Sequence, residues 1–251
     1  MAYLLYGIVK DPGINEIITG VKGKPVIFVE AHGLCVAASE LDIEEGAAPI
    51  AELLAYAQVV ETLHNRQAIV PMRYGCFLKG ISAIQDILKA RQRQYETLLA
   101  ELAGHVEMGI RILLPENDSY AREEGTSNYA NAPFVTVTTV EAKEELTLSG
   151  HDYLNLRKVH YRMQEETFQG RQALIDRYIG AFSGLYARHR TETDTKKGSV
   201  ILSLYFLTPE SDVNRFRETF GDVMTKGNDE AMLSGPWPPY NFVTTDLSPA
   251  K

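Results

Sequence analysis

The amino-acid sequence predicts an α+β protein of two domains, an N-terminal ferredoxin-like α/β sandwich followed by a helix-rich α+β domain. Apolar runs of strand length alternate with amphipathic stretches of helical period through residues 3–114. Polar residues without a period then fill 115–133, and further helix and strand patterns follow. The predicted limits are 1–114 for the first domain, 115–149 for a linker or irregular segment, and 150–251 for the second domain.

The first domain is expected to contain a sheet built from short apolar runs. Tyr3–Val9 carries apolar residues on both faces, which predicts a buried strand. His32 and Gly33 separate two further runs by a tight connection, which predicts a β-hairpin. The predicted strands are Tyr3–Val9, Val26–Glu30, Leu34–Leu41, an extended stretch within Ala68–Phe77, and Val106–Leu114.

Two helices are expected to cover one face of this sheet. Pro49 opens the first helix, because proline is well tolerated in a first helical turn. The apolar positions of this helix, spaced as one stripe, are Ile50, Leu53, Leu54, Ala57, Val60 and His64. The second helix is predicted over Ser82–Ala103, with Gly104 as its stop.

The second domain is expected to be richer in helix. Within the region between, Phe134–Val140 fits a short strand and Glu141–Leu148 a helical turn. A helical pattern extends over His151–Arg190 with a break near Gly170, and its stripes are expected to form domain core rather than a coiled coil. The polar run Arg188–Lys197 is expected to close this helical region. The remaining predicted elements are a central strand Val200–Leu207, a helix Pro209–Thr225 and a strand starting at Ala231–Ser234.

Composition excludes several classes of partner. The formal net charge of −8 argues against nucleic acid as a main ligand. The N-terminal apolar run has no basic flank and reaches Lys10 and Asp11 too early for a signal peptide. No apolar run approaches the ~18 residues of a membrane-spanning helix. Two cysteines, Cys35 and Cys76, fit a reducing compartment better than a disulfide scaffold. We therefore expect a soluble cytoplasmic protein without a membrane partner.

The sequence contains no recognised catalytic motif. None of the common phosphate-loop, dinucleotide, serine-hydrolase or zinc-protease motifs occurs. His32 and Cys35 form a loose pair across a turn, but a zinc site needs two more ligands. Cys76 stands among apolar residues, where burial is expected to raise the thiol pKa and make it inert. We expect no catalytic residue, no cofactor and no metal, so the sequence predicts a protein that is not an enzyme.

Arg73 and Glu107 are charged residues within predicted strands. Regular alternation places Arg73 on the face of Ile69 and Pro71, and Glu107 on the polar face of its own strand, so that a pair between the two side chains is plausible. One interpretation is a half-exposed ion pair that contributes little to stability. The other is a polar contact that seats another segment of the chain on the sheet. A purely structural role is the preferred expectation.

The segment Gly235–Phe242 stands out near the C-terminus. It contains the only tryptophan of the chain, Trp237, together with Pro236, Pro238, Pro239 and Tyr240. Each proline fixes φ and lacks an N–H, so the segment reads as a stiff extended ribbon. Either Trp237 plugs its own domain core or it presents an aromatic surface to a partner. The inward orientation is the preferred expectation.

Five motifs, in order along the chain, resemble those of the gas vesicle protein GvpF/GvpL family, most like GvpF. They are Tyr3–Val9, Val70–Gly75 after the helix that ends at His64, Val106–Arg111, Gly150–Leu154 and Gly235–Phe242. The chain departs from the family pattern at Tyr74, where phenylalanine is usual, and at Met108, where an aromatic residue is common. The resemblance covers nearly the whole chain, and the C-terminal motif is its most specific part.

The resemblance implies a non-enzymatic accessory protein of gas vesicles, the gas-filled protein shells of aquatic prokaryotes. Such a protein is a minor structural component or assembly factor that contacts the small hydrophobic shell protein GvpA, and other gas vesicle accessory proteins are further partners. Its place is the gas vesicle within the cytoplasm, and its family fold is two α+β domains, the first ferredoxin-like. The motif residues that become interaction or structural candidates are Arg73, Tyr74, Gly75, Glu107, Gly235, Pro236, Trp237, Pro238, Pro239 and Tyr240.

Two other functions compete with this one. A ferredoxin-like sandwich often binds small molecules, so a ligand-binding regulatory module is the main alternative. A hydrolase that uses Cys76 or a histidine is a third hypothesis, and it requires an accessible thiol with a low pKa.

Overall fold

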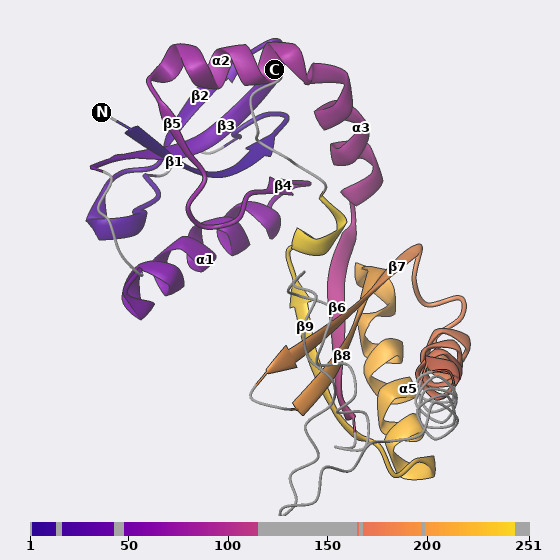
Figure 1. The fold of residues 1–251 in the computed structure, drawn as a ribbon. Coiled ribbons are helices and arrows are strands. Elements are labelled where there is room, and N and C mark those ends of the chain that lie inside the picture. The colour runs from indigo at the N-terminus through magenta and orange to yellow at the C-terminus, as the bar shows by residue number, and fades with distance from the viewer. Residues whose placement is uncertain are drawn as a thin grey trace, which may run out of the picture.

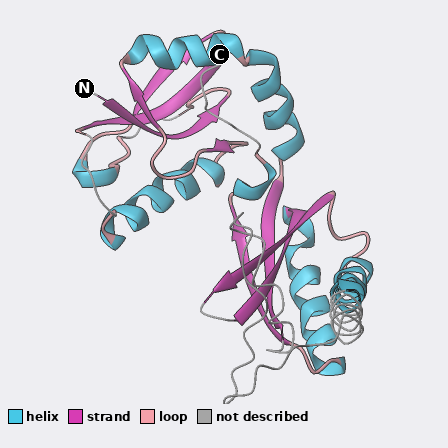
Figure 2. Ribbon diagram, in the orientation of Figure 1, coloured by secondary structure: helices cyan, strands magenta, loops and turns pink. Residues whose placement is uncertain are grey.

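Two antiparallel sheets with helices packed against them make up the fold (Figure 1, Figure 2). This computed structural model describes residues 2–13, 17–42, 48–114, 165, 168–196 and 199–243. The mixed composition of helices and antiparallel strands confirms the predicted α and β content. The predicted linker, the elements expected within 134–148 and the start of the long helical pattern lie outside the described residues.

The first sheet has the strand order β2-β3-β1-β4, with β5 also paired to β1. Its strands are β1 (Ala2–Val9), β2 (Ile27–Ala31), β3 (Leu34–Leu41), β4 (Val70–Pro71) and β5 (Phe77–Lys79). The predicted hairpin is confirmed, since β2 pairs antiparallel with β3 across His32 and Gly33. Both turn residues have positive φ, 53° at His32 and 73° at Gly33. Glycine adopts this conformation without steric cost.

Helices lie on both faces of the first sheet (Figure 1). On one face Tyr3 and Leu5 of β1 pack with residues of α2 (Ile81–Ala90) and α3 (Gln92–Leu102). On the other face Leu4 and Tyr6 pack with α1 (Ile50–His64). The expectation that both helical stretches cover one face is therefore wrong. The cause is β1 itself, because a strand that is apolar on both sides needs a partner on each side.

The second predicted helix consists of two helices. The chain breaks at Arg91, whose φ of −122° and ψ of 19° are not helical, so Ser82–Ala103 is not continuous. The apolar period continues across the break, from Leu88 to Tyr95, which is why the pattern predicted one helix. Gly104 has a φ of 68° and stops α3 as expected.

Most of the apolar stripe predicted for α1 does not face the core. Of its apolar members only Val60 is buried, and the other buried residues of the helix are Tyr56, Val59 and Leu63. Ile50 is 76% exposed and Leu54 is 65% exposed, and Leu53 is also exposed. The first half of α1 therefore carries an apolar surface that we call the α1 outer face, defined by Ile50, Leu53 and Leu54.

The second sheet has the strand order β7-β8-β6-β9. Its strands are β6 (His105–Leu114), β7 (Arg188–Lys196), β8 (Ser199–Pro209) and β9 (Glu230–Trp237). The expectation that Val106–Leu114 belongs to the first sheet is wrong, because β6 pairs with β8 and β9. The central position of β8 is confirmed. The limits of the two predicted domains and the ferredoxin-like arrangement stay predictions.

β7 corrects the assignment of Arg188–Lys197 to a helical region. The strand pairs with β8 over its whole length, yet the side chains of residues 188–195 are exposed. An exposed edge strand has no apolar alternation, so the sequence carries no strand signal there. Residues 168–181 are helical as predicted, but the break expected near Gly170 is absent within them, because the helix continues through Gly170.

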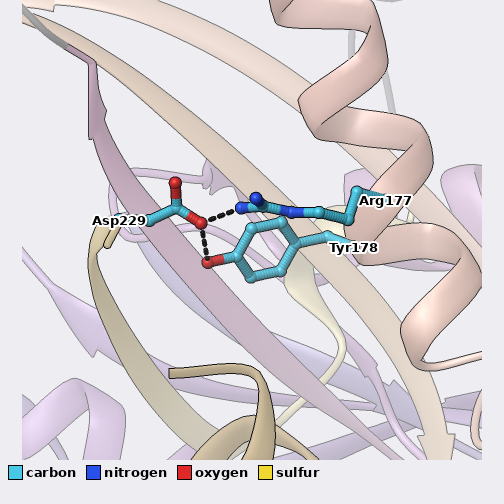
Figure 3. Close-up of polar contacts among 3 residues, drawn as sticks. All are labelled: Arg177, Tyr178 and Asp229. Carbon is cyan, nitrogen blue, oxygen red and sulfur yellow. Dashed lines mark hydrogen bonds and ion pairs between the residues drawn. The ribbon is translucent and has the colours of Figure 1, made fainter. Parts of the chain in front are cut away.

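The helix at 168–181 and α5 (Val213–Lys226) pack against the second sheet. Three aromatic rings form the centre of this core: Phe182 stacks on Phe216 at 4.2 Å, and Phe206 lies 5.4 Å from Phe216. Arg177 and the Tyr178 hydroxyl both donate to the Asp229 carboxylate, the latter over 3.1 Å (Figure 3). This contact ties the helix to the loop that leads into β9.

Gly235 is the tightest backbone position of the second sheet. Its φ is +108°, and a Cβ there would lie 2.6 Å from the Glu107 carbonyl oxygen and 3.3 Å from the Met108 Cα. The pairing of β6 with β9 shifts register at this place. Only glycine allows the two strands to approach so closely.

We predict that Gly235→Ala lowers the free energy of unfolding by roughly 1–3 kcal/mol, because backbone atoms have to move and the conformation is strained. Urea denaturation of the wild type and the variant measures this. Gly221→Ala in α5 is the matched control, since nothing lies within 4 Å of its added Cβ. The control is expected to stabilise the helix by about 0.5–1 kcal/mol. A Gly235→Ala protein as stable as the wild type would contradict the prediction.

Candidate functional site

The C-terminal segment Gly235–Phe242 connects the two sheets. Its first part belongs to β9, where Trp237 lies opposite Glu107 of β6. Its last part is a 3-10 turn, Tyr240–Phe242, that leaves the second sheet and packs on the first. Phe242 is buried in the core that contains α2 and α3, together with Leu207 of β8. The segment thus contributes side chains to both halves of the structure.

Glu107 is the acceptor that holds this turn in place. Its Oε2 accepts a hydrogen bond of 2.8 Å from the backbone N–H of Asn241, and its Oε1 accepts one of 2.7 Å from the Asn241 side-chain amide. The residue is only 5% exposed. Burial raises the pKa of the Glu107 carboxyl, and the hydrogen bonds from Asn241 oppose that rise. A buried carboxylate is retained here because both oxygens are hydrogen-bonded.

Two arginines complete the surroundings of Asn241. Nη2 of Arg73 donates to Asn241 Oδ1 over 3.3 Å, and Nη1 of Arg190 donates to the Asn241 backbone oxygen over 2.8 Å. The backbone N–H, the backbone carbonyl and both side-chain polar atoms of Asn241 therefore all have partners. Arg73 lies after β4 of the first sheet, whereas Arg190 lies on β7 of the second. Asn241 is the polar link between the sheets.

The half-exposed ion pair between Arg73 and Glu107 is not what the structure shows, because Glu107 is buried and Asn241 lies between the two side chains. The structure joins the two residues through Asn241, so the polar contact seats another segment of the chain. Sequence reasoning did not single out Asn241 itself. Its only signal was its place inside the C-terminal motif, next to the more conspicuous prolines and aromatic residues.

A group of tyrosines receives the ring of Tyr240. Tyr240 packs against the core that contains Tyr56, and burial raises its pKa, with the Glu107 charge adding to the rise. The Tyr56 hydroxyl lies 2.8 Å from the carbonyl oxygens of Leu5 and Met72. The ring of Tyr56 stacks on Tyr6 at 5.0 Å. The turn is thus held by aromatic packing as well as by hydrogen bonds.

Tyr74 and Gly75 shape the first-sheet side of this contact. The Tyr74 ring meets Tyr56 edge-on at 5.3 Å, and its hydroxyl donates to Glu52 of α1 over 2.9 Å. Gly75 has a φ of 95°. It allows the chain to turn back after Arg73, whose carbonyl accepts a hydrogen bond from the Cys76 N–H. The turn sets Arg73 at the edge where Asn241 arrives.

Trp237 does not plug the core. Its side chain is 51% exposed, so the preferred inward orientation is wrong. Pro238, Pro239 and Phe242 are the buried members of the segment instead. Strand alternation at the edge of the second sheet turns the indole outward, and the rigid prolines behind it carry the chain inward.

Of the two free thiols, Cys35 is buried and Cys76 is half-buried. Burial raises the pKa of the Cys35 thiol to about 11, with the charges of Glu30 and Asp11 adding to the rise. Burial also raises the pKa of Cys76, although Arg73 opposes it. The predicted direction of the Cys76 shift is confirmed, and the hydrolase hypothesis requires the opposite shift. Within the described part of the chain, His, Cys, Asp and Glu form no group of three that could hold a metal ion.

Comparison with known proteins gives the family. The model of the gas vesicle synthesis protein GvpL/GvpF family matches residues 2–244. The chain belongs to the GvpL/GvpF family. Among relatives, it is 21% identical over 243 residues to gas vesicle protein F1 of Halobacterium salinarum, covering 95% of this chain and 91% of that one. It is 25% identical over 201 residues to gas vesicle protein L2 of the same organism, covering 76% and 70%.

Solved structures of GvpF show the same fold. The crystal structure of GvpF from Anabaena sp. PCC7120 aligns with a TM-score of 0.72 at 17% identity, covering 96% of this chain and 95% of that chain. GvpF from Microcystis aeruginosa aligns with a TM-score of 0.71 at 15% identity, covering 96% and 98%. No helix in the described ranges of this GvpL/GvpF member is long and apolar enough to cross a membrane.

The exposed and buried aromatic residues of the C-terminal segment are predicted to respond differently to truncation. Phe242→Ala is expected to lower the free energy of unfolding by about 3–5 kcal/mol, because it leaves a cavity between the sheets. Trp237→Ala is expected to lower it by no more than about 1 kcal/mol, because the indole is half in solvent. Urea denaturation compares the two variants. Equal losses would contradict the assignment of Phe242 as the buried anchor.

Glu107 gives a pH-dependent prediction for this family member. Because the folded-state pKa is raised above its ordinary value of 4.5, the folded protein holds the proton more tightly than the unfolded chain. The contribution of Glu107 to the free energy of unfolding is fully present below pH 4.5, and it is lost as the pH rises through the folded-state pKa. Relative to Glu107→Gln, the wild type should therefore gain stability as the pH falls from neutral toward 4.5.

Urea denaturation of both proteins across this pH range is the measurement. The Glu107→Gln variant is the reference for the wild type, because glutamine keeps the side-chain shape and cannot titrate. A difference in unfolding free energy that stays constant, or that shrinks as the pH falls, would contradict the prediction.

Proposed function

We propose that this chain is a non-enzymatic accessory protein of gas vesicles, a minor structural component or assembly factor that contacts the shell protein GvpA. Membership of the GvpL/GvpF family over residues 2–244 supports the gas vesicle role. The proposal places the protein at the gas vesicle within the cytoplasm, with other gas vesicle proteins as further partners. It keeps a division into two domains, with the first domain of the predicted limits 1–114 shortened to end before β6, because β6 pairs in the second sheet.

The observation that carries the contact with GvpA is the α1 outer face. Ile50, Leu53 and Leu54 project from consecutive turns of one helix and are exposed, although the sequence predicts them to pack inside. Exposed apolar side chains grouped on one face are typical of protein–protein contact sites. A small hydrophobic shell protein needs its apolar surface covered before assembly, and the α1 outer face offers an apolar surface of matching character.

The rest of the protein fits a role that depends on surfaces. The polar and aromatic contacts of the candidate site hold two sheets in a fixed arrangement, and such a body presents its outer helix without reordering. The net charge of −8 keeps the remaining surface soluble. Trp237 is a further exposed apolar residue that a partner is able to cover.

We predict that Leu54→Asp reduces association with GvpA at least about tenfold, because a carboxylate is desolvated in the apolar contact. Stability should change little, since the residue is 65% exposed. The measurements are binding of purified GvpA segments and co-purification with intact vesicles before and after a urea wash.

Gln58→Asp is the matched control, because it adds the same charge at an exposed polar position of the same helix. The control should bind GvpA as the wild type does. If the wild type neither binds GvpA nor purifies with vesicles, the proposed function is wrong. If it binds and Leu54→Asp binds equally well, GvpA contacts a different surface.

A further inference from the structure

β7 is an edge strand with an unusual order of charges. Its even-numbered positions from 188 to 194 share one face and carry two basic and then two acidic side chains: Arg188, Arg190, Glu192 and Asp194. The odd-numbered positions on the other face carry His189 and three threonines. All of these side chains are exposed. In the described part of the chain β7 pairs only with β8, so its outer edge has no strand partner there.

An unpaired edge of this length offers backbone N–H and C=O groups to another strand. In each copy of β7 the backbone N–H and C=O groups that are not bonded to β8 belong to every second residue. An antiparallel pair of two copies must bring these residues opposite each other, so even positions face even positions. A two-fold axis at Thr191 satisfies this condition. It places Arg190 opposite Glu192 and Arg188 opposite Asp194, and it does so twice, because each pair recurs across the axis.

Neighbouring registers match less well, because each keeps only one kind of opposite-charge pair and brings like charges together at its axis. A shift of the register by two positions in one direction brings Arg190 opposite Arg190 of the second copy. The same shift in the other direction brings Glu192 opposite Glu192. Like charges directly opposite each other are destabilising, whereas opposite charges stabilise a cross-strand pair. A parallel pairing in register would place every charge opposite its own kind.

The odd-numbered positions on the other face of β7 also form compatible pairs about the axis at Thr191. Thr191 lies opposite Thr191 of the second copy, and His189 lies opposite Thr193. Threonine pairs are favourable across strands. The existing contacts of the two arginines are compatible with the pairing: Arg190 donates one N–H to the Asn241 carbonyl, and Arg188 pairs with Glu101 over 2.9 Å. A guanidinium has five N–H donors, so further acceptors are accommodated.

We propose that a second copy of this chain binds along β7, antiparallel and centred on Thr191, and joins the two second sheets into one continuous sheet. Charges on an edge strand usually prevent pairing. Here they select one register and one partner, because only a strand with the same order of charges reversed in direction matches them. This inference does not depend on the contact with GvpA.

Sedimentation equilibrium of the full chain tests the proposal. The wild type is expected to dimerise, and added salt should weaken the dimer because the cross-strand charges are exposed. Glu192→Arg places like charges opposite each other twice and should weaken dimerisation at least about tenfold. Glu218→Arg makes the same change of charge on the exposed side of α5 and should leave the dimer unchanged.

A mixing experiment tests the register. Arg190→Glu alone should also be monomeric, because it leaves two acidic positions at the axis of each chain. When this variant is mixed with Glu192→Arg, positions 190 and 192 carry opposite charges across both halves of the axis. The mixture should therefore form a heterodimer that neither variant forms alone, and dissociation on dilution would measure it.

Three results would overturn the proposal: a wild type that is monomeric at the highest soluble concentration, a Glu192→Arg variant that dimerises like the wild type, or a mixture that stays monomeric although both variants are folded. Thermal melts establish that the variants are folded. The wild type and Glu192→Arg decide between a β7 dimer and no β7 dimer even if Arg190→Glu does not fold, since Glu192 makes none of the four hydrogen bonds that seat Asn241.

Discussion

The whole arrangement depends on the seating of Asn241. Four hydrogen bonds reach this residue, two from it to Glu107 and one to it from each of Arg73 and Arg190. They connect one residue of the C-terminal turn to the first sheet and to two strands of the second. A buried carboxylate is costly unless its oxygens are hydrogen-bonded, and Asn241 satisfies both oxygens of Glu107. The polar contact is therefore strict: it requires this residue in this position.

The chain crosses between the two sheets along two routes. The first is covalent, where α3 ends at Gly104 and the chain continues directly into β6. The second is the C-terminal turn, which returns from β9 and inserts Tyr240 and Phe242 against the first sheet. A single covalent connection allows rotation, whereas a second contact at a distance from it resists rotation. Apolar burial of Phe242 supplies most of the attraction, and the hydrogen bonds of Asn241 fix the orientation.

Membership of the GvpL/GvpF family agrees with the distribution of chemistry in the molecule. Three groups whose pKa is raised, Glu107, Tyr240 and Tyr56, lie where the C-terminal turn packs on the first sheet, and burial is the main cause of each shift. The exposed features are of a different kind: an apolar stretch of α1, a tryptophan at the end of β9 and a charged edge strand. Internal polar contacts give the body its shape, and the surfaces are left for partners.

The sequence by itself determined the local elements wherever a periodic apolar pattern was present. It predicted β1, the β2–β3 hairpin, the central strand β8 and the stop of α3 at Gly104, because each depends on neighbouring residues. It also singled out Arg73, Glu107 and the C-terminal motif as notable residues. The family resemblance drawn from these motifs is confirmed by the match over residues 2–244.

Only the tertiary structure decided which elements meet. β6 lies in the second sheet, Trp237 points outward, and the first half of the apolar stripe of α1 is exposed, because these outcomes depend on contacts between residues far apart in the chain. β7 carried no strand signal, since an edge strand in solvent needs no apolar alternation. Asn241 acquires its role only when β4, β6 and β7 converge on it, and no local pattern encodes a hydrogen bond to Glu107 across 134 positions.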